Sequence, residues 1–168
     1  MRAETVGGSQ AVPTLRFMLS HPAHCLSLGF GAGLIPFAPG TWGALLGLVL
    51  ARWGQPVVGD LAFMACLAVA FVLGVWATRI TERALGEHDH PAIVWDEIVA
   101  MAFVAAIVNG SLAAQAVLFL LFRLFDIVKP GPVGWADRRF DGGWGVMFDD
   151  AVAAGLTLFL AAVVVRLW

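Results

Sequence analysis

The chain has 168 residues, the length of one domain rather than two. Hydrophobic residues make up 60% of it, charged residues 13%, and the mean hydropathy is +0.86. Disorder, a coiled coil and a secreted disulfide scaffold are excluded, because each requires polar or cysteine-rich sequence. The net charge of −2 provides no basic excess for phosphate backbones, so we expect no nucleic-acid partner. The composition predicts an all-α, compact multi-helix membrane bundle without β-sheet.

The N-terminal part, residues 1–24, is interpreted as a polar or amphipathic segment, and residues 25–168 as a single helical domain. This N-terminal part lacks the apolar run of ~7–15 residues that a cleaved signal peptide requires. Cys25 and Cys66 lie in apolar surroundings with no metal-ligand spacing around them. We expect both to be buried, unpaired thiols.

Residues 41–51 predict a helix that follows a segment broken by glycine and proline, residues 29–40. At ~1.5 Å per residue this helix covers about 17 Å, too little for a hydrocarbon core of ~30 Å. Thr41 is placed to cap its start. Residues 61–78 form an uncharged run of 18 and predict a membrane crossing.

Residues 98–122 form an uncharged run of 25, interrupted by the turn-formers Asn109, Gly110 and Ser111. We predict a central helical hairpin that turns there without crossing the membrane, since residues 98–108 again cover only about 17 Å. Residues 151–165 are apolar and end at Arg166 and Trp168, residue types that anchor helices at membrane interfaces. They predict the last crossing.

Ten of the 12 carboxylates lie in two windows, residues 79–97 and 123–150. The pairs Asp96-Glu97 and Asp149-Asp150 each stand directly before an apolar run, so both are predicted at helix N-termini. Capping explains one acid at each place but not two. Each pair could supply a metal ligand and a group for proton transfer, and oxygen ligands without His or Cys favour Mg²⁺.

A third group of charges, Arg123, Asp126 and Lys129, recurs every third residue and shares one face of a helix stopped by Pro130. A carboxylate between two cations suits a phosphate site, in which the acid holds a divalent metal and the cations bind phosphate oxygens. The alternative is a structural, salt-bridged helix end.

Four weaker patterns have simple explanations. Residues 142–145 could turn backbone N–H groups toward an anion. The glycines of residues 29–33 resemble a nucleotide loop but lack its strand and its Lys-Ser/Thr ending. Residues 88–90, His-Asp-His, could clip a metal but are interpreted as a solvated loop. Residues 81–83 are interpreted as an ordinary charged helix face.

Four motifs occur in order: GFGAGLIPFAPGTWG at residues 29–43, IVWDE at 93–97, FRLFDIVKPGP at 122–132, and DRR with GGWGVMFDD within 137–150. In this order they resemble the phosphatidylglycerophosphatase A family, over residues 28–155. The resemblance implies an Mg²⁺-dependent phosphatase that converts phosphatidylglycerophosphate to phosphatidylglycerol in the bacterial inner membrane. It also implies a multi-pass protein with its active site on the cytoplasmic face, and we expect no obligate protein partner.

The resemblance assigns two groups of site residues. The candidate metal or catalytic carboxylates are Asp96, Glu97, Asp126, Asp149 and Asp150. The candidate phosphate contacts are Arg123, Lys129, Arg138 and Arg139, with Thr41 added as a hydroxyl contact. These residues fit attack by water and attack by a carboxylate equally well.

Two other functions share some of these sequence features. A CDP-lipid phosphatidyltransferase would also combine membrane helices, acids and Mg²⁺, but its Asp-Gly and Ala-Arg spacing is absent. In a non-enzymatic multi-pass membrane protein, the acids should be replaceable one at a time.

Overall fold

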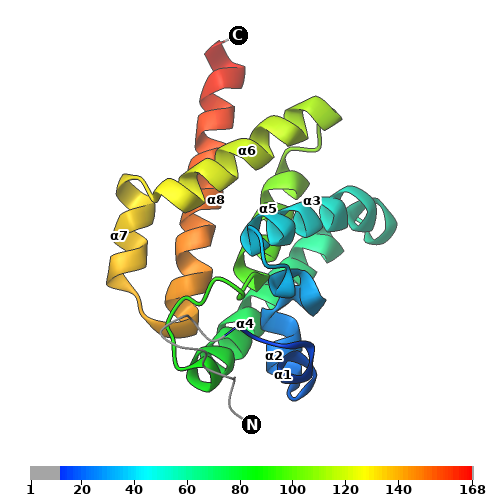
Figure 1. Cartoon of the computed structure of the whole chain (residues 1–168). Helices are drawn as coiled ribbons and strands as arrows, with labels where there is room; N and C mark the ends of the chain where they lie inside the picture. Colours follow the sequence, from blue (N-terminus) through cyan, green and yellow to red (C-terminus); the bar gives the residue numbers. More distant parts are fainter. Residues whose placement is uncertain (1–11, 168) are drawn as a thin grey trace.

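The computed structural model describes residues 12–167, and in that range the chain forms helices and no strand (Figure 1). The elements are α1 (Leu15–Leu19), α2 (Pro22–Ser27), the 3₁₀ helix η1 (Gly29–Leu34), α3 (Pro39–Val58), α4 (Asp60–Leu85), α5 (Trp95–Ile107), α6 (Leu112–Val128), α7 (Gly131–Arg139) and α8 (Gly142–Leu167). The predicted all-α fold is confirmed. The part of the N-terminal segment at residues 1–11, and Trp168, lie outside the described residues.

Within residues 12–167, two helices are long and apolar enough to cross a membrane: Asp60–Leu85, which is α4, and Gly142–Arg166, which is nearly all of α8. They contain the predicted crossings at residues 61–78 and 151–165. The two helices pack on each other, and the C-terminal turns of α8 extend beyond the other helices (Figure 1). Both spans are mostly exposed within the protein, at 22% and 28% buried, as expected of helices that meet lipid.

Helix α3 is longer than predicted, with 20 residues in place of residues 41–51. It extends beyond residue 51 through Gly54 and Pro56 to Val58, and Gly43 and Gly47 within it let the helix approach α5 closely. A Cβ at Gly47 would lie 2.2 Å from the carbonyl oxygen of Ile98. The helix starts at Pro39, after Ala38 in the left-handed region at φ 46°. The prediction that Thr41 caps this helix was therefore wrong.

The predicted hairpin is present. Helix α5 ends at Ile107 and α6 begins at Leu112, where the Ser111 hydroxyl accepts a hydrogen bond from the Ala114 N–H at 3.2 Å. The other ends of the two helices meet, because Arg123 of α6 lies 3.5 Å from Glu97 of α5.

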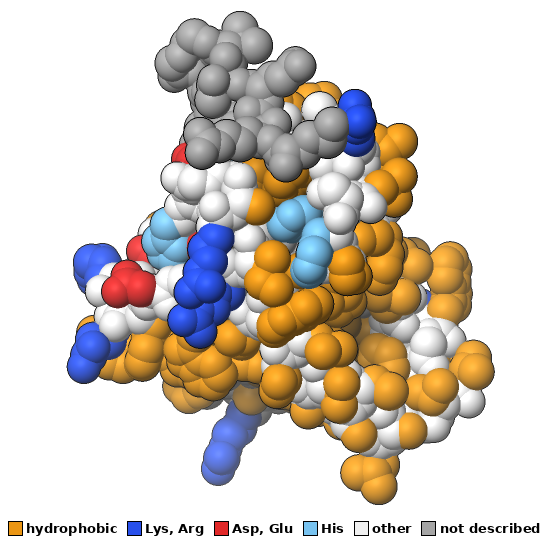
Figure 2. All heavy atoms as spheres, turned by 90° about the horizontal axis from the view of Figure 1, so that it is seen from below, with side chains coloured by type: hydrophobic (Ala, Val, Ile, Leu, Met, Phe, Trp, Pro, Cys, Tyr) orange, Lys and Arg blue, Asp and Glu red, His pale blue; other side chains and the backbone are white. Residues whose placement is uncertain are grey.

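The core lies between α5, α6 and α8, where Met101, Val104 and Phe122 have no exposed surface. Many apolar side chains remain outside it. Figure 2 shows most of the visible charged side chains at the left of the view, with hydrophobic side chains over much of the rest of this face. Cys25 and Cys66 are both unpaired, but Cys66 is exposed and Cys25 only half-buried. The prediction of two buried thiols was therefore wrong, because Cys66 lies on an outward face of α4.

Candidate active site

One cavity of about 260 Å³ collects charges from four parts of the chain. All five predicted carboxylates line it: Asp96, Glu97, Asp126, Asp149 and Asp150. Arg123 and Lys129 line it as well. We call this space the acid cavity. Because α5, α6 and α8 each carry part of it, the site forms only when the bundle is folded.

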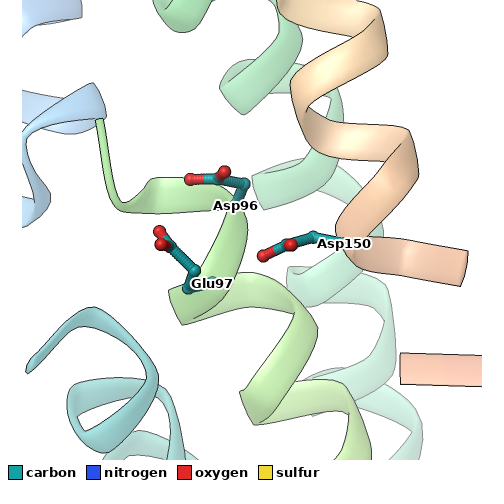
Figure 3. Close-up of side chains that lie close together, drawn as sticks. All are labelled: Asp96, Glu97 and Asp150. Atoms are coloured by element: carbon teal, nitrogen blue, oxygen red, sulfur yellow. The ribbon is translucent and has the colours of Figure 1, made fainter. Parts of the chain in front are cut away.

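Three carboxylates are close enough to share one cation. Asp96 and Glu97 in the first turn of α5, and Asp150 of α8, place ligand oxygens within 4.8 Å of one another. Their side chains converge on the space between the two helices (Figure 3). Each has a buried oxygen without a hydrogen-bond partner among the described residues: Asp96 Oδ1, Glu97 Oε2 and Asp150 Oδ2. Buried carboxylate oxygens left unpaired are costly, so this set fits a hard divalent cation.

The two acids of α5 lose their protons less readily than ordinary carboxyls when no cation is bound. Burial raises the pKa of the Asp96 carboxyl well above its usual value, and the neighbouring Glu97 raises it further. Burial raises the pKa of Glu97 to about 8, with Asp126 adding to the rise and Arg123 opposing it. Either acid can therefore hold a proton near neutral pH that a metal would displace.

Arg123 connects two of the site acids. Its guanidinium donates to Asp126, one turn later in α6, and lies 3.5 Å from Glu97 Oε1. Its Nε is buried and unpartnered among the described residues, so it retains a donor. Gly40, at the start of α3, makes room for this pair, since a Cβ there would lie 2.0 Å from Glu97 Oε1.

Lys129 does not share Asp126 with Arg123, as the three-residue spacing predicted. It follows the last residue of α6 in the left-handed region, at φ 47°, and this turns it toward other acids. Its ammonium donates to Asp137 and, at 2.7 Å, to Asp149 Oδ2, and it lies 3.6 Å from Asp89 Oδ2. Burial lowers the pKa of Lys129, but the bonds to Asp137 and Asp149 outweigh burial and raise it above its ordinary value.

The loop between α4 and α5 contributes residues that the sequence patterns missed. His88 and Asp89 are exposed, as the interpretation of residues 88–90 as a solvated loop predicted, but His90 is buried, and both Asp89 and His90 line the acid cavity. Glu82 holds this loop: its Oε1 accepts from the Asp89 N–H at 3.0 Å and lies 2.5 Å from His88 Nδ1. Thr81 and Glu82 are buried, so residues 81–83 are not an ordinary charged face. The only sequence signal was a carboxylate six residues before a His-Asp-His run.

Three predicted phosphate contacts are not among the residues that line the acid cavity: Thr41, Arg138 and Arg139. Arg138 and Arg139 are exposed in the last turn of α7, and Arg139 lies over the Phe140 ring at 6.0 Å. Helix α7 directs them away from the site while it presents Asp137 to Lys129.

The second acid pair is not at a helix N-terminus. Helix α8 begins at Gly142, so Asp149 and Asp150 lie inside it, and dipole or capping effects do not explain them. Residues 142–145 are not an anion site in this cavity either. Their glycines serve packing, because a Cβ at Gly143 would lie 2.3 Å from the Val75 carbonyl oxygen and one at Gly145 equally close to that of Phe140.

Comparison with known proteins gives one consistent family. The family model of phosphatidylglycerophosphatase A matches residues 25–165. The chain is 42% identical to phosphatidylglycerophosphatase A of Haemophilus influenzae over 84% of this chain and 88% of that protein. It is 35% identical to the protein of the same name from Escherichia coli, over 86% of this chain and 87% of that protein.

A third relative, from Bacteroides thetaiotaomicron, has a name that refers to a phosphatidylinositol-3-phosphatase. It is 39% identical over 82% of this chain and 90% of that protein. No solved structure matches the chain significantly. The acid cavity, with its cluster of carboxylates and two cations, is built from residues inside the matched range. The chain belongs to the phosphatidylglycerophosphatase A family, and it is an enzyme of the phosphatase class.

Proposed function

We propose that this protein hydrolyses the terminal phosphomonoester of phosphatidylglycerophosphate, giving phosphatidylglycerol and inorganic phosphate, with Mg²⁺ as cofactor. The observation that carries the proposal is the convergence of six carboxylates, Asp89 and the five predicted ones, with two cations on one cavity in a chain of this family. The names of the Haemophilus and Escherichia relatives favour this substrate. The product would serve glycerophospholipid synthesis in the bacterial inner membrane.

The metal would be held by Asp96, Glu97 and Asp150, since their ligand oxygens lie within 4.8 Å of one another. Each of these carboxylates also has one buried oxygen without a hydrogen-bond partner among the described residues. When bound, Mg²⁺ supplies positive charge that neutralises the phosphate oxygens and favours attack at phosphorus. Carboxylates arranged in this way without a cation would repel one another and a phosphate alike.

Arg123 and Lys129 would bind the remaining phosphate oxygens. Arg123 offers a planar fork and Lys129 a mobile point charge, and both already line the cavity. In the hydrolysis a P–O bond forms to water and the P–O bond to glycerol breaks. A proton leaves the water for a cavity carboxylate, and the glycerol oxygen takes up a proton as it departs.

The test is phosphate release from phosphatidylglycerophosphate in detergent micelles, with Mg²⁺ and then with EDTA. We expect Asp126→Asn and Asp149→Asn to lower the rate at least about 100-fold, the scale on which electrostatic groups act in catalysis. Asp141→Asn is the matched control, because Asp141 is exposed and does not line the cavity. Folded protein that releases no phosphate, or two site variants with full activity, would contradict the proposal.

The Bacteroides relative suggests a second substrate for comparison. Phosphatidylinositol 3-phosphate also carries a phosphomonoester on a lipid head group, so the same assay should include it. We expect faster release from phosphatidylglycerophosphate. The reverse preference would keep the phosphatase chemistry and overturn the proposed substrate.

A further inference from the structure

A second cavity, also of about 260 Å³, adjoins the acid cavity. It lies between α4, α5 and α8, and its walls are apolar, with Met64, Phe71, Val99, Phe103 and Met147 among the lining residues. We call it the apolar groove. Among the described residues, Asp96 is the single charged residue that lines it, and Asp96 also lines the acid cavity. The two spaces therefore share one carboxylate of the site as a wall.

The position of the groove indicates what can occupy it. Two of its three walls are α4 and α8, the helices that are long and apolar enough to cross a membrane. On α4 the rim residue Ala68 is exposed, and so are the nearby Val69 and Val72. A groove between membrane-crossing helices, with an exposed apolar rim, is open to lipid chains rather than to polar solutes.

A third cavity supplies a comparison within the same protein. It is about 280 Å³ in volume, is lined by Phe63, Cys66 and Ile98 among others, and has no charged residue in its lining. It does not share a site acid with the acid cavity. Apolar walls are thus not peculiar to the groove, with which this cavity shares Leu67 and Val99; a lining residue shared with the acid cavity is.

We infer that the apolar groove holds one fatty acyl chain of the lipid substrate while the phosphorylated head group lies in the acid cavity. This inference rests on the proposed function. An acyl chain gains little from leaving one apolar medium for another, so the groove acts by orienting the lipid relative to the carboxylates. Filling the groove should then lower kcat/KM for a long-chain substrate.

The experiment compares two leucine substitutions at exposed positions of α4. Ala68→Leu projects into the apolar groove, and Cys66→Leu projects into the third cavity, which has no site acid. We expect Ala68→Leu to lower kcat/KM on dioleoyl phosphatidylglycerophosphate about tenfold, and Cys66→Leu to change it less than twofold. Ala151→Leu, on the α8 wall of the groove, should behave like Ala68→Leu.

A second readout does not depend on turnover. Phosphatidylglycerophosphate with a diazirine on one acyl chain should, on illumination, label α4 and α8 peptides that line the groove, and Ala68→Leu should reduce this labelling. Equal kcat/KM for Ala68→Leu and Cys66→Leu, or labelling of the third cavity instead, overturns the inference. If the wild type releases no phosphate from any phosphatidylglycerophosphate, it is the proposed function that fails.

Discussion

The Arg123 guanidinium lies 3.5 Å from the Glu97 carboxylate and thereby joins the end of α6 to the first turn of α5. Both side chains are largely buried, at 13% and 12% exposed. The hairpin thus closes on this pair in addition to the apolar core around Phe122. Both members of the pair line the acid cavity, so the contact that closes the fold also belongs to the site.

Replacement of Arg123 by glutamine should damage activity and stability together. The change leaves Glu97 and Asp126 without their cation, and removing one partner of a buried pair costs about 3 kcal/mol. We expect the rate of phosphate release to fall about 100-fold. Thermal unfolding in detergent measures the stability, and Arg52→Gln, at an exposed position of α3, is the control. An Arg123→Gln protein with normal activity would show that the pair is structural only.

Gly40→Ala should inactivate the protein even though alanine favours helices. Its Cβ would lie 2.0 Å from Glu97 Oε1 and 3.1 Å from Arg123 Nη1, so the pair must move. Gly54→Ala in the same helix is the matched control, because its Cβ would meet only the Phe63 ring, at 3.3 Å. We expect Gly54→Ala to keep activity and to change the stability by no more than about 1 kcal/mol. Equal activity of both variants would contradict the close contact at Gly40.

The metal-free protein should lose stability as pH rises toward 8. The pKa of Glu97 is raised from 4.5 to about 8, so between these values the folded protein holds a proton that the unfolded chain has released. The contribution of Glu97 is therefore complete below about pH 4.5 and is lost as pH rises through about 8. Thermal unfolding in EDTA from pH 6 to 8.5 measures the slope. Glu97→Gln should flatten it, and an unchanged slope in that variant would assign the effect to other groups.

Glu82→Ala should loosen the loop between α4 and α5. The variant removes the acceptor for the Asp89 N–H and the contact to His88, so Asp89 is no longer held 3.6 Å from Lys129. We expect activity to fall about tenfold and amide exchange in the loop to rise, consistent with loss of about 1–2 kcal/mol of local hydrogen bonding. Glu82→Gln keeps the acceptor and should restore most activity. Arg83→Ala, at the next and exposed position, should change neither readout.

Two exposed positions near the site, 88 and 138, should be accessible to a labelling reagent from the same side of the membrane. His88, in the loop before α5, and Arg138, in α7, are exposed beside residues that contact Lys129. Single cysteines at these two positions, in a protein with Cys25 and Cys66 replaced by alanine, should react with an impermeant maleimide in inverted inner-membrane vesicles. Protection in right-side-out spheroplasts would place the site on the cytoplasmic face. Labelling of the two positions from opposite sides would contradict a shared site.

Local patterns predicted the helices that depend on local chemistry. The apolar runs placed α4 and α8, and the turn-formers at residues 109–111 placed the bend of the hairpin. The extent of α3 was missed because the predicted helix stopped before the charged Arg52, whereas α3 continues through Gly54 and Pro56 to Val58. The close contact of Gly43 and Gly47 with α5 was not predicted either, because it depends on a partner helix more than 40 residues away in the chain.

The five predicted carboxylates all line the acid cavity, but Asp89, which lines it as well, and the partners of these acids were not predicted. Spacing along α6 could not show that Lys129 leaves the helix in a left-handed conformation and binds Asp137 and Asp149 instead of Asp126. Nor could it show that the loop after α4 folds back onto Glu82. These contacts cross from one helix to a loop or to another helix, so periodicity within a single helix carries no signal for them.

The close approach of α3 to α5 gives the site a fixed side and an adjustable one. With the Gly47 backbone against the Ile98 carbonyl, α5 cannot slide without collision, so Asp96 and Glu97 have little freedom to move. Lys129, by contrast, follows the end of α6 and is held by three side chains, from a loop, from α7 and from α8, of which those of Asp89 and Asp137 are exposed by 48% and 38%. Entry of a doubly charged head group and departure of the freed anion would then be accommodated at the Lys129 end, while the α5 end keeps its shape through every cycle.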